Sequence, residues 1–174
     1  MHQANKIFLI GFMGSGKSTT GRKLASQLNW SFIDLDEKIE KMEGIRIPDI
    51  FSIKGEPYFR KIETKALREM KSETNTVIST GGGTPCFGDN MDFMLSSGLT
   101  IYLKMTPACL KRRLTKLSER RPLLKDIDRK DLLGYITSKL EEREKWYLMA
   151  KIVVDGFNTD LSDLLSLIKK QIRQ

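Results

Sequence analysis

The 174-residue sequence predicts an α/β protein whose parallel sheet carries helices on both faces. Two observations lead to this fold class. Short apolar segments that suit buried strands alternate with segments of helical periodicity. In addition, the polar motifs directly follow strand segments, as expected when ligands bind beyond the carboxyl ends of parallel strands. The length favours a single domain over residues 1–174.

Five segments are short and apolar enough to be strands. They cover residues 7–10, 30–34, 76–80, 99–103 and 152–154. Helices are expected after residue 16, from 55 to 70, from 87 to 97, after 106, from about 128 to 149 and from 161 to 172. The stretch 39–53 has mixed helical periodicity that Gly44 and Pro48 interrupt. Gly98 is expected to end the helix over 87–97 as a C-terminal glycine.

The first strand runs into the motif G-x-x-x-x-G-K-S at Gly11–Ser18, and a helical pattern follows. This order of strand, glycine loop and helix start is the context of a phosphate-binding loop. Backbone N–H groups and the helix dipole bind the phosphates, a lysine reaches the β- and γ-phosphates, and a serine hydroxyl binds Mg²⁺. The expected nucleotide-binding residues are therefore Gly14, Ser15, Gly16, Lys17, Ser18 and Thr19.

Composition excludes several classes of protein. No run of 18 apolar residues occurs, and the N-terminus lacks a signal pattern, so we expect no membrane partner. Cys86 and Cys109 lie far apart, which argues against a disulfide framework or zinc site and favours the cytoplasm. The only histidine, His2, is near the terminus, so histidine acid–base chemistry is not expected.

The formal net charge of +8 raises the possibility of nucleic-acid binding. Residues 111–130 hold nine Lys or Arg and three Asp or Glu, so much of the excess lies in one stretch. Such a segment suits a lid over a nucleotide as well as a nucleic-acid patch. Because no stacking aromatic residues interleave with it, we expect no nucleic-acid partner.

Asp34 and Asp36 stand at the end of the second strand. Two positions apart in an extended chain, their side chains would point the same way. One carboxylate can hold the metal through water, and the other can hold and deprotonate an acceptor hydroxyl. The alternative is local, because Asp34 and Glu37 also have the spacing of a helix capping box.

Gly81, Gly82 and Gly83 directly follow the third strand, where their backbone can approach a ligand closely. A flexible turn is the alternative. Three consecutive glycines lose much conformational entropy on ordering, which favours a functional role over a simple corner.

Two arginines lie in helical patterns. Arg143 falls on the apolar stripe of its helix, where a buried cation needs a partner. That partner is either an anionic ligand or an internal carboxylate, unless the side chain snorkels so that the guanidinium reaches solvent. Arg60 has Glu56 and Glu63 at helical spacing, so an ion pair explains it equally well. In the basic segment, Arg121 either closes over a transferring phosphate or belongs to a solvated loop.

Taken together, these residues resemble the shikimate kinase family. The similarity runs through GFMGSGKSTTGRKLA, FIDLDEKIE, IFSIKGEPYFRKIET, ISTGGGTP and RRPLLK, and then the helix of Arg143. The resemblance implies ATP-dependent phosphorylation of the 3-hydroxyl of shikimate, on the way to chorismate and the aromatic amino acids. It also implies a three-layer P-loop kinase fold with strand order 2-3-1-4-5, a substrate-binding region at 34–62, a lid at 114–126 and a monomer.

The resemblance also assigns roles to residues. Lys17, Asp36 and Arg121 match catalytic residues, and Ser18 and Asp34 match the Mg²⁺ ligand and its water-mediated partner. The residues matching the shikimate site are Asp36, Arg60, Gly81, Gly82, Gly83 and Arg143, with the two arginines holding the carboxylate. Arg113 and Arg121 match nucleotide-binding positions before and within the lid.

The chain departs from the family pattern at two places. Lys145 replaces the usual proline of R-x-P-x-Y, and Thr84-Pro85-Cys86 replaces the more usual Ala-Val after the glycines. The nearest alternative function is another small-molecule kinase of the same fold, for gluconate or a nucleotide. A GTPase-like switch is a second alternative, but the sequence lacks the N-K-x-D motif that reads the base. A third is a nucleic-acid-dependent ATPase, for which the basic segment is the sole support.

Overall fold

The computed structural model describes residues 5–117, 127–128 and 130–172. Its centre is one five-stranded sheet in the order β2-β3-β1-β4-β5, and every neighbouring pair is parallel. The strands are β1 (Lys6–Ile10), β2 (Ser31–Asp34), β3 (Thr76–Ser79), β4 (Leu99–Lys104) and β5 (Ile152–Asp155). The predicted strands, their direction and their order are confirmed.

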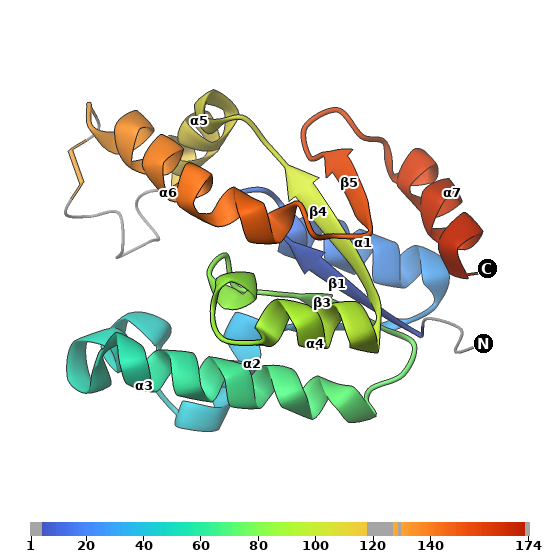
Figure 1. The fold of residues 1–174 in the computed structure, drawn as a ribbon, viewed down its shortest axis with the longest axis horizontal. Coiled ribbons are helices and arrows are strands. Elements are labelled where there is room, and N and C mark those ends of the chain that lie inside the picture. Colours follow the sequence, from blue (N-terminus) through green and yellow to red (C-terminus); the bar gives the residue numbers. More distant parts are fainter. Residues whose placement is uncertain (1–4, 118–126, 129, 173–174) are drawn as a thin grey trace.

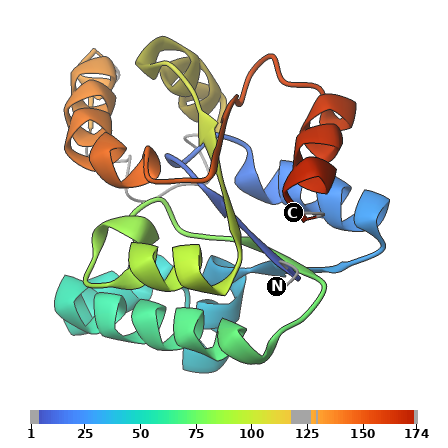
Figure 2. The same ribbon diagram turned by 45° about the vertical axis from the view of Figure 1, so that its right-hand side comes forward.

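Helices cover both faces of the sheet (Figures 1 and 2). They are α1 (Lys17–Leu28), α2 (Leu35–Glu43), α3 (Ile47–Glu69), α4 (Asn90–Ser97), α5 (Pro107–Leu117), α6 (Leu132–Tyr147) and α7 (Leu161–Ile172). Two short 3₁₀ turns, η1 (Met70–Ser72) and η2 (Thr84–Cys86), follow α3 and the glycine triplet. Among the described residues, no helix is long and apolar enough to cross a membrane.

Alternate residues of the central strand β1 supply the two cores. Ile7 and Leu9 pack with α1 and α7, whereas Phe8 and Ile10 pack in the larger core beneath α2 to α6. All five residues of β1 are buried. This explains why residues 7–10 of the strand form a continuous apolar run rather than an alternating pattern.

The strand order places the functional loops side by side. β1 lies between β3 and β4, with Leu9 opposite Ser79 and Ile10 opposite Tyr102. The loop after β1 therefore leaves the sheet beside the loop after β3. β2 borders β3 on its other side, with Asp34 opposite Ser79. The carboxyl ends of three neighbouring strands thus form one rim.

The helix boundaries differ from expectation in the segment 35–69. α2 begins directly after β2 and ends at Glu43 with Gly44 as its C-cap, and α3 already begins at Ile47 with Pro48 in its first turn. Gly55, at φ 80° and ψ 168°, breaks α3 into two parts. The predicted helix start at Gly55 is therefore the start of the second part.

Gly98 ends α4 as predicted, with its N–H donating to the carbonyl oxygen of Met94, but its conformation is not the expected one. Its φ of −176° is extended rather than left-handed. A Cβ at this position would lie 2.7 Å from the carbonyl oxygen of Lys6. The glycine permits close packing of the chain against β1 instead of capping α4 in a left-handed turn.

Candidate nucleotide and acceptor site

The loop between β1 and α1 is built for close approach of backbone to a ligand. Gly16 precedes α1 at φ 91°, and Gly14 has φ 80°, a region that favours glycine. The Lys17 ammonium donates hydrogen bonds to the carbonyl oxygens of Gly11 and Phe12, at 2.8 and 2.9 Å. These bonds hold the buried Lys17 side chain over the loop. The Ser15 hydroxyl is buried, and it has no hydrogen-bond partner among the described residues.

Arg113 of α5 lies against this loop. Its Nη1 is 3.5 Å from the carbonyl oxygen of Gly14, and a Cβ at Gly16 would approach the same atom to 3.0 Å. Arg113 also lines the cavity over the loop. The structure thus brings the predicted nucleotide-side arginine to the loop, although α5 is distant in sequence.

Ser18, Asp34 and Ser79 form an oxygen-rich cluster where three elements meet. The Ser18 hydroxyl donates to Asp34 Oδ2 at 2.5 Å and lies 3.2 Å from the Ser79 hydroxyl. Asp34 Oδ1 also accepts hydrogen bonds from the backbone N–H groups of Asp36 and Glu37. Asp34 therefore caps α2 through one oxygen, while its other oxygen faces Ser18 and is placed where the predicted metal role would require it.

This cluster fits a magnesium ion. Hydroxyl and carboxylate oxygens are its preferred ligands, and it is commonly held by one or two protein groups together with phosphates and water. The described residues contain no group of three or more His, Cys, Asp or Glu that could hold a metal by themselves. A site completed by a nucleotide agrees with both observations.

Asp36 lies in the first turn of α2 rather than in an extended strand. The geometric reason given by the sequence, two side chains pointing the same way along a strand, is therefore wrong. Its position nevertheless suits the predicted role. The Asp36 side chain lines both the cavity over the phosphate loop and the neighbouring cavity, at the point where they adjoin.

Each glycine of the triplet is packed against a polar side chain of the site. A Cβ at Gly81 would lie 2.9 Å from Glu63 Oε1 and 3.1 Å from Asp36 Oδ1. A Cβ at Gly83 would lie 2.8 Å from Nη1 of Arg60. A side chain at Gly81 or Gly83 would therefore displace Glu63 or Arg60, so the triplet is more than a flexible turn.

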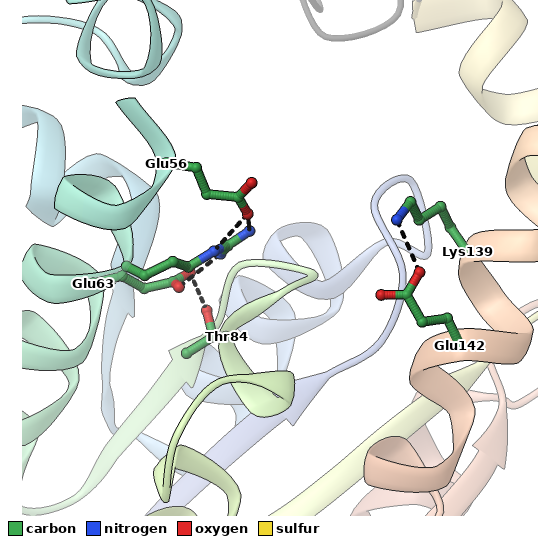
Figure 3. A network of polar contacts seen from close by, with 6 residues as sticks. Glu56, Glu63, Thr84, Lys139 and Glu142 are labelled. Atoms are coloured by element: carbon green, nitrogen blue, oxygen red, sulfur yellow. Dashed lines mark hydrogen bonds and ion pairs between the residues drawn. The ribbon is translucent and has the colours of Figure 1, made fainter. Parts of the chain in front are cut away.

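Arg60 is fixed by a polar network on α3 (Figure 3). Its Nη1 donates to Glu63 Oε2 at 2.8 Å, and Nε and Nη2 donate to Glu56 Oε1 at 3.1 and 3.0 Å. The buried Glu63 also accepts a hydrogen bond of 2.6 Å from the Thr84 hydroxyl. Both ion pairs expected from the sequence are present. Thr84, one of the residues that depart from the family pattern, anchors the inner one.

Arg143 extends from α6 toward the glycine triplet. Its guanidinium lies 5.6 Å from the centre of the Phe12 ring, and Nη1 would be 3.7 Å from a Cβ at Gly82. Among the described residues, no carboxylate lies within ion-pair distance of Arg143. An internal carboxylate is therefore not the partner of this arginine within the described part of the chain.

Sequence reasoning missed several contributors. Tyr147 lies two helical turns after Leu140 on the apolar stripe of α6 and is fully buried. Its hydroxyl donates a hydrogen bond to the carbonyl oxygen of Gly82, which is 65 positions away in the sequence. Burial raises the pKa of Tyr147, which keeps the phenol a donor. The Phe87 ring stacks on the Arg60 guanidinium at 3.9 Å. Only the apolar character of these two residues was visible in the sequence.

Two cavities adjoin at the rim of the sheet. The first, of about 410 Å³, lies over the phosphate loop and is lined by Lys17, Ser18, Asp34 and Arg113 among others. The second, of about 280 Å³, is lined by Arg60, Glu63, Lys139 and Arg143 among others. Both cavities share Met13, Asp36, Gly81 and Gly82. An apolar groove of about 570 Å³ between α5, α6 and β5 touches none of the predicted residues.

The lid assignment falls almost entirely on residues outside those that the structure describes. Arg121 lies in that part of the chain, together with residues 118–126. The described start of the predicted lid belongs to the end of α5.

Comparison with known proteins gives a consistent result. A family model described as Shikimate kinase matches residues 13–173. A curated shikimate kinase from Azobacteroides pseudotrichonymphae is 44% identical over 168 residues, which cover 96% of this chain and 99% of the relative.

Two solved structures are similar to nearly the whole chain. Shikimate kinase from Bacteroides thetaiotaomicron is 38% identical with a TM-score of 0.86, over 97% of this chain and 96% of the other. Shikimate kinase from Acinetobacter baumannii in complex with shikimate is 32% identical with a TM-score of 0.83, over 98% and 92% of the two chains.

Proposed function

The chain belongs to the shikimate kinase family, and we propose that it transfers the γ-phosphoryl group of ATP to the 3-hydroxyl of shikimate. The products are 3-phosphoshikimate and ADP. The observation that carries this proposal is the pair of adjoining cavities, one over a phosphate loop and one facing two arginines, with Asp36 lining both.

The donor nucleotide occupies the cavity over the phosphate loop. The backbone of Gly14, Ser15 and Gly16 surrounds its phosphates, and the N-terminus of α1 adds the positive end of the helix dipole. Thr19 lines the same cavity, and Arg113 lies at its α5 side. Lys17 exchanges its bonds to the loop carbonyls for the phosphate oxygens.

Mg²⁺ is the metal we propose for the cluster of Ser18 and Asp34, with Ser18 as direct ligand and Asp34 acting through water. When bound, the ion neutralises charge on the phosphate oxygens. The hard oxygen donors of this cluster support the choice of metal.

The acceptor occupies the second cavity, with its carboxylate between Arg60 and Arg143. Charge-assisted hydrogen bonds from two guanidinium groups orient the ring, and the backbone of Gly81, Gly82 and Gly83 lies along it. Asp36 accepts a hydrogen bond from the 3-hydroxyl and takes its proton as the oxygen attacks the γ-phosphorus. The bond between that phosphorus and the oxygen bridging to ADP breaks as the new one forms. Lys17, with Arg121 from the lid, neutralises the charge that develops.

Coupled measurement of ADP release tests this function. A panel of hydroxylated acids, sugars and nucleoside monophosphates should give rapid turnover only with shikimate. Turnover with gluconate or a nucleotide, and none with shikimate, would replace the proposal with another kinase of the same fold. Stimulation by RNA or DNA in place of shikimate would revive the nucleic-acid alternative.

The remaining assignments belong to the same proposal. The chain acts as a cytoplasmic monomer with a single kinase domain, in which residues 34–62 bind the acceptor and 114–126 form the lid. Analytical ultracentrifugation of the purified chain tests the proposed monomeric state, because a sedimenting mass of twice the chain mass would contradict it.

A further inference from the structure

Arg60 lines the acceptor cavity and already has two carboxylates bound to it. Figure 3 labels these carboxylates, Glu56 and Glu63. The two partners differ in burial. The Glu63 side chain is 1% exposed and is held in addition by Thr84, whereas the Glu56 side chain is 54% exposed. Glu63 is thus a fixed partner of Arg60, and Glu56 can leave it for solvent.

Glu56 occupies an edge of the guanidinium that a carboxylate ligand would use. Its Oε1 accepts from both Nε and Nη2, which together form one of the two forks by which arginine binds a planar anion. Since Glu63 takes Nη1, the fork held by Glu56 is the accessible one with the weaker partner. The carboxylate of a ligand must therefore compete with the Glu56 carboxylate for this fork of Arg60.

The charge of the cavity leads to the same conclusion. Among its lining residues, the cations are Arg60, Lys139 and Arg143, and the carboxylates are Asp36, Glu56 and Glu63. The formal charges balance without a ligand. An acceptor carboxylate that enters while Glu56 stays adds an uncompensated negative charge, and outward rotation of Glu56 removes it.

We propose that Glu56 is an internal competitor for the acceptor's carboxylate: it neutralises Arg60 until an anionic acceptor displaces it. This inference rests on the proposed function, because it takes Arg60 as a ligand of that carboxylate. Its consequence is selectivity. A neutral alcohol cannot displace Glu56, so it finds the charge of Arg60 already neutralised. The carboxylate of shikimate displaces Glu56 and binds Arg60, and only an exposed ion pair is lost.

Calorimetric titration without nucleotide tests the proposal directly. Glu56→Gln should bind shikimate about 2- to 5-fold more tightly than the unsubstituted chain, the range of a typical exposed ion pair. It should bind the methyl ester of shikimate with unchanged affinity. Glu56→Ala is a second variant with the same expected direction, and the exposure of the position favours a folded protein in both.

The matched control is Glu69→Gln. Glu69 lies on the same helix, forms an exposed ion pair of 3.0 Å with Lys38 and does not line the cavity. It should leave both affinities unchanged. Weaker or unchanged shikimate binding by Glu56→Gln, or equal tightening for acid and ester, would overturn the competitor role. Failure of the unsubstituted chain to bind shikimate at all would instead overturn the proposed function.

Discussion

Asp36 is the carboxylate that lines both the nucleotide cavity and the acceptor cavity, and the proposed reaction depends on it. Asp36→Asn keeps the size of the group but removes its capacity to take a proton. We expect kcat to fall by about 10²- to 10⁴-fold, the usual contribution of a positioned general base. Binding of a non-hydrolysable ATP analogue, measured by titration, should stay within about twofold. Turnover near that of the unsubstituted chain would remove Asp36 from the catalytic step.

Tyr102 is a buried residue whose hydroxyl has no hydrogen-bond partner among the described residues. Tyr102→Phe should stabilise the fold, because an unsatisfied buried polar group costs about 1–3 kcal/mol. Thermal denaturation at pH 8 measures the effect. A lower melting temperature would show that the hydroxyl has a partner in solution.

The same substitution should change the response to alkali. Burial is the main cause that raises the pKa of Tyr102, so the folded chain keeps this proton at pH values where the unfolded chain loses it. The contribution of the protonated Tyr102 to stability is therefore complete below the ordinary tyrosine pKa of 10 and is lost as the pH rises above it. Tyr102→Phe should show a smaller loss of stability between pH 9 and about 11. An identical slope in both proteins would contradict the shift.

At the residue scale, the sequence predicted side chains whose chemistry follows from local spacing. Lys17, the pair of glutamates around Arg60, and Arg143 on its apolar stripe are examples. Contacts between distant positions could not be predicted, because no local pattern records them. The bond from Tyr147 to the glycine loop and the bond from Thr84 to Glu63 belong to this group.

The glycine triplet acts as one element because its backbone fits between side chains from α2, α3 and α6. Gly83→Ala places a methyl group 2.8 Å from Arg60 Nη1, which Glu63 holds in place. We expect the Michaelis constant for shikimate to rise by about tenfold or more, which corresponds to a loss of about 1.4 kcal/mol of binding free energy, because a displaced Arg60 holds the carboxylate less well. The Michaelis constant for ATP should change little. An equal effect on both constants would show a general collapse of the loop.

Gly134 in α6 provides a control of opposite sign. A Cβ there would meet no atom within 4 Å. Gly134→Ala should therefore stabilise the helix by about 0.5–1 kcal/mol without affecting shikimate binding. Chemical denaturation gives the free energy of unfolding. A destabilised variant would show that α6 needs a glycine at this position.

At the scale of elements, the strands could be predicted because buried parallel strands are short apolar runs between glycine and polar loops. The segment 35–69 was harder. There the chain turns from β2 directly into α2, and α3 continues through Gly55 at a positive φ. Tertiary contacts of Ile50 and Phe59 in one core hold both parts of α3 in place, and sequence periodicity does not contain that information.

The whole molecule should respond to each ligand separately, because the two cavities adjoin without being one. Shikimate at about 100 times its dissociation constant should stabilise the fold by about 2.7 kcal/mol, which corresponds to roughly 5–10 °C in melting temperature. Arg143→Ala should lose most of this shift while retaining the shift caused by an ATP analogue. If Arg143→Ala lost only the melting-temperature shift caused by the ATP analogue, Arg143 would bind the nucleotide and not the acceptor. Thermal denaturation with each ligand in turn measures both.

The position of β1 at the centre of the sheet has a consequence for synthesis of the chain. Both of its neighbours come later in the sequence, since Lys6 pairs with Thr76 and Ile7 with Leu99. As the polypeptide leaves the ribosome, the phosphate loop emerges early, yet its strand has an unpaired edge until β4 has followed. Unpaired apolar strands invite association with other chains. A nascent chain shorter than about 100 residues should therefore depend on chaperones and bind no nucleotide, and competence should arise in one step once β4 is free to pair.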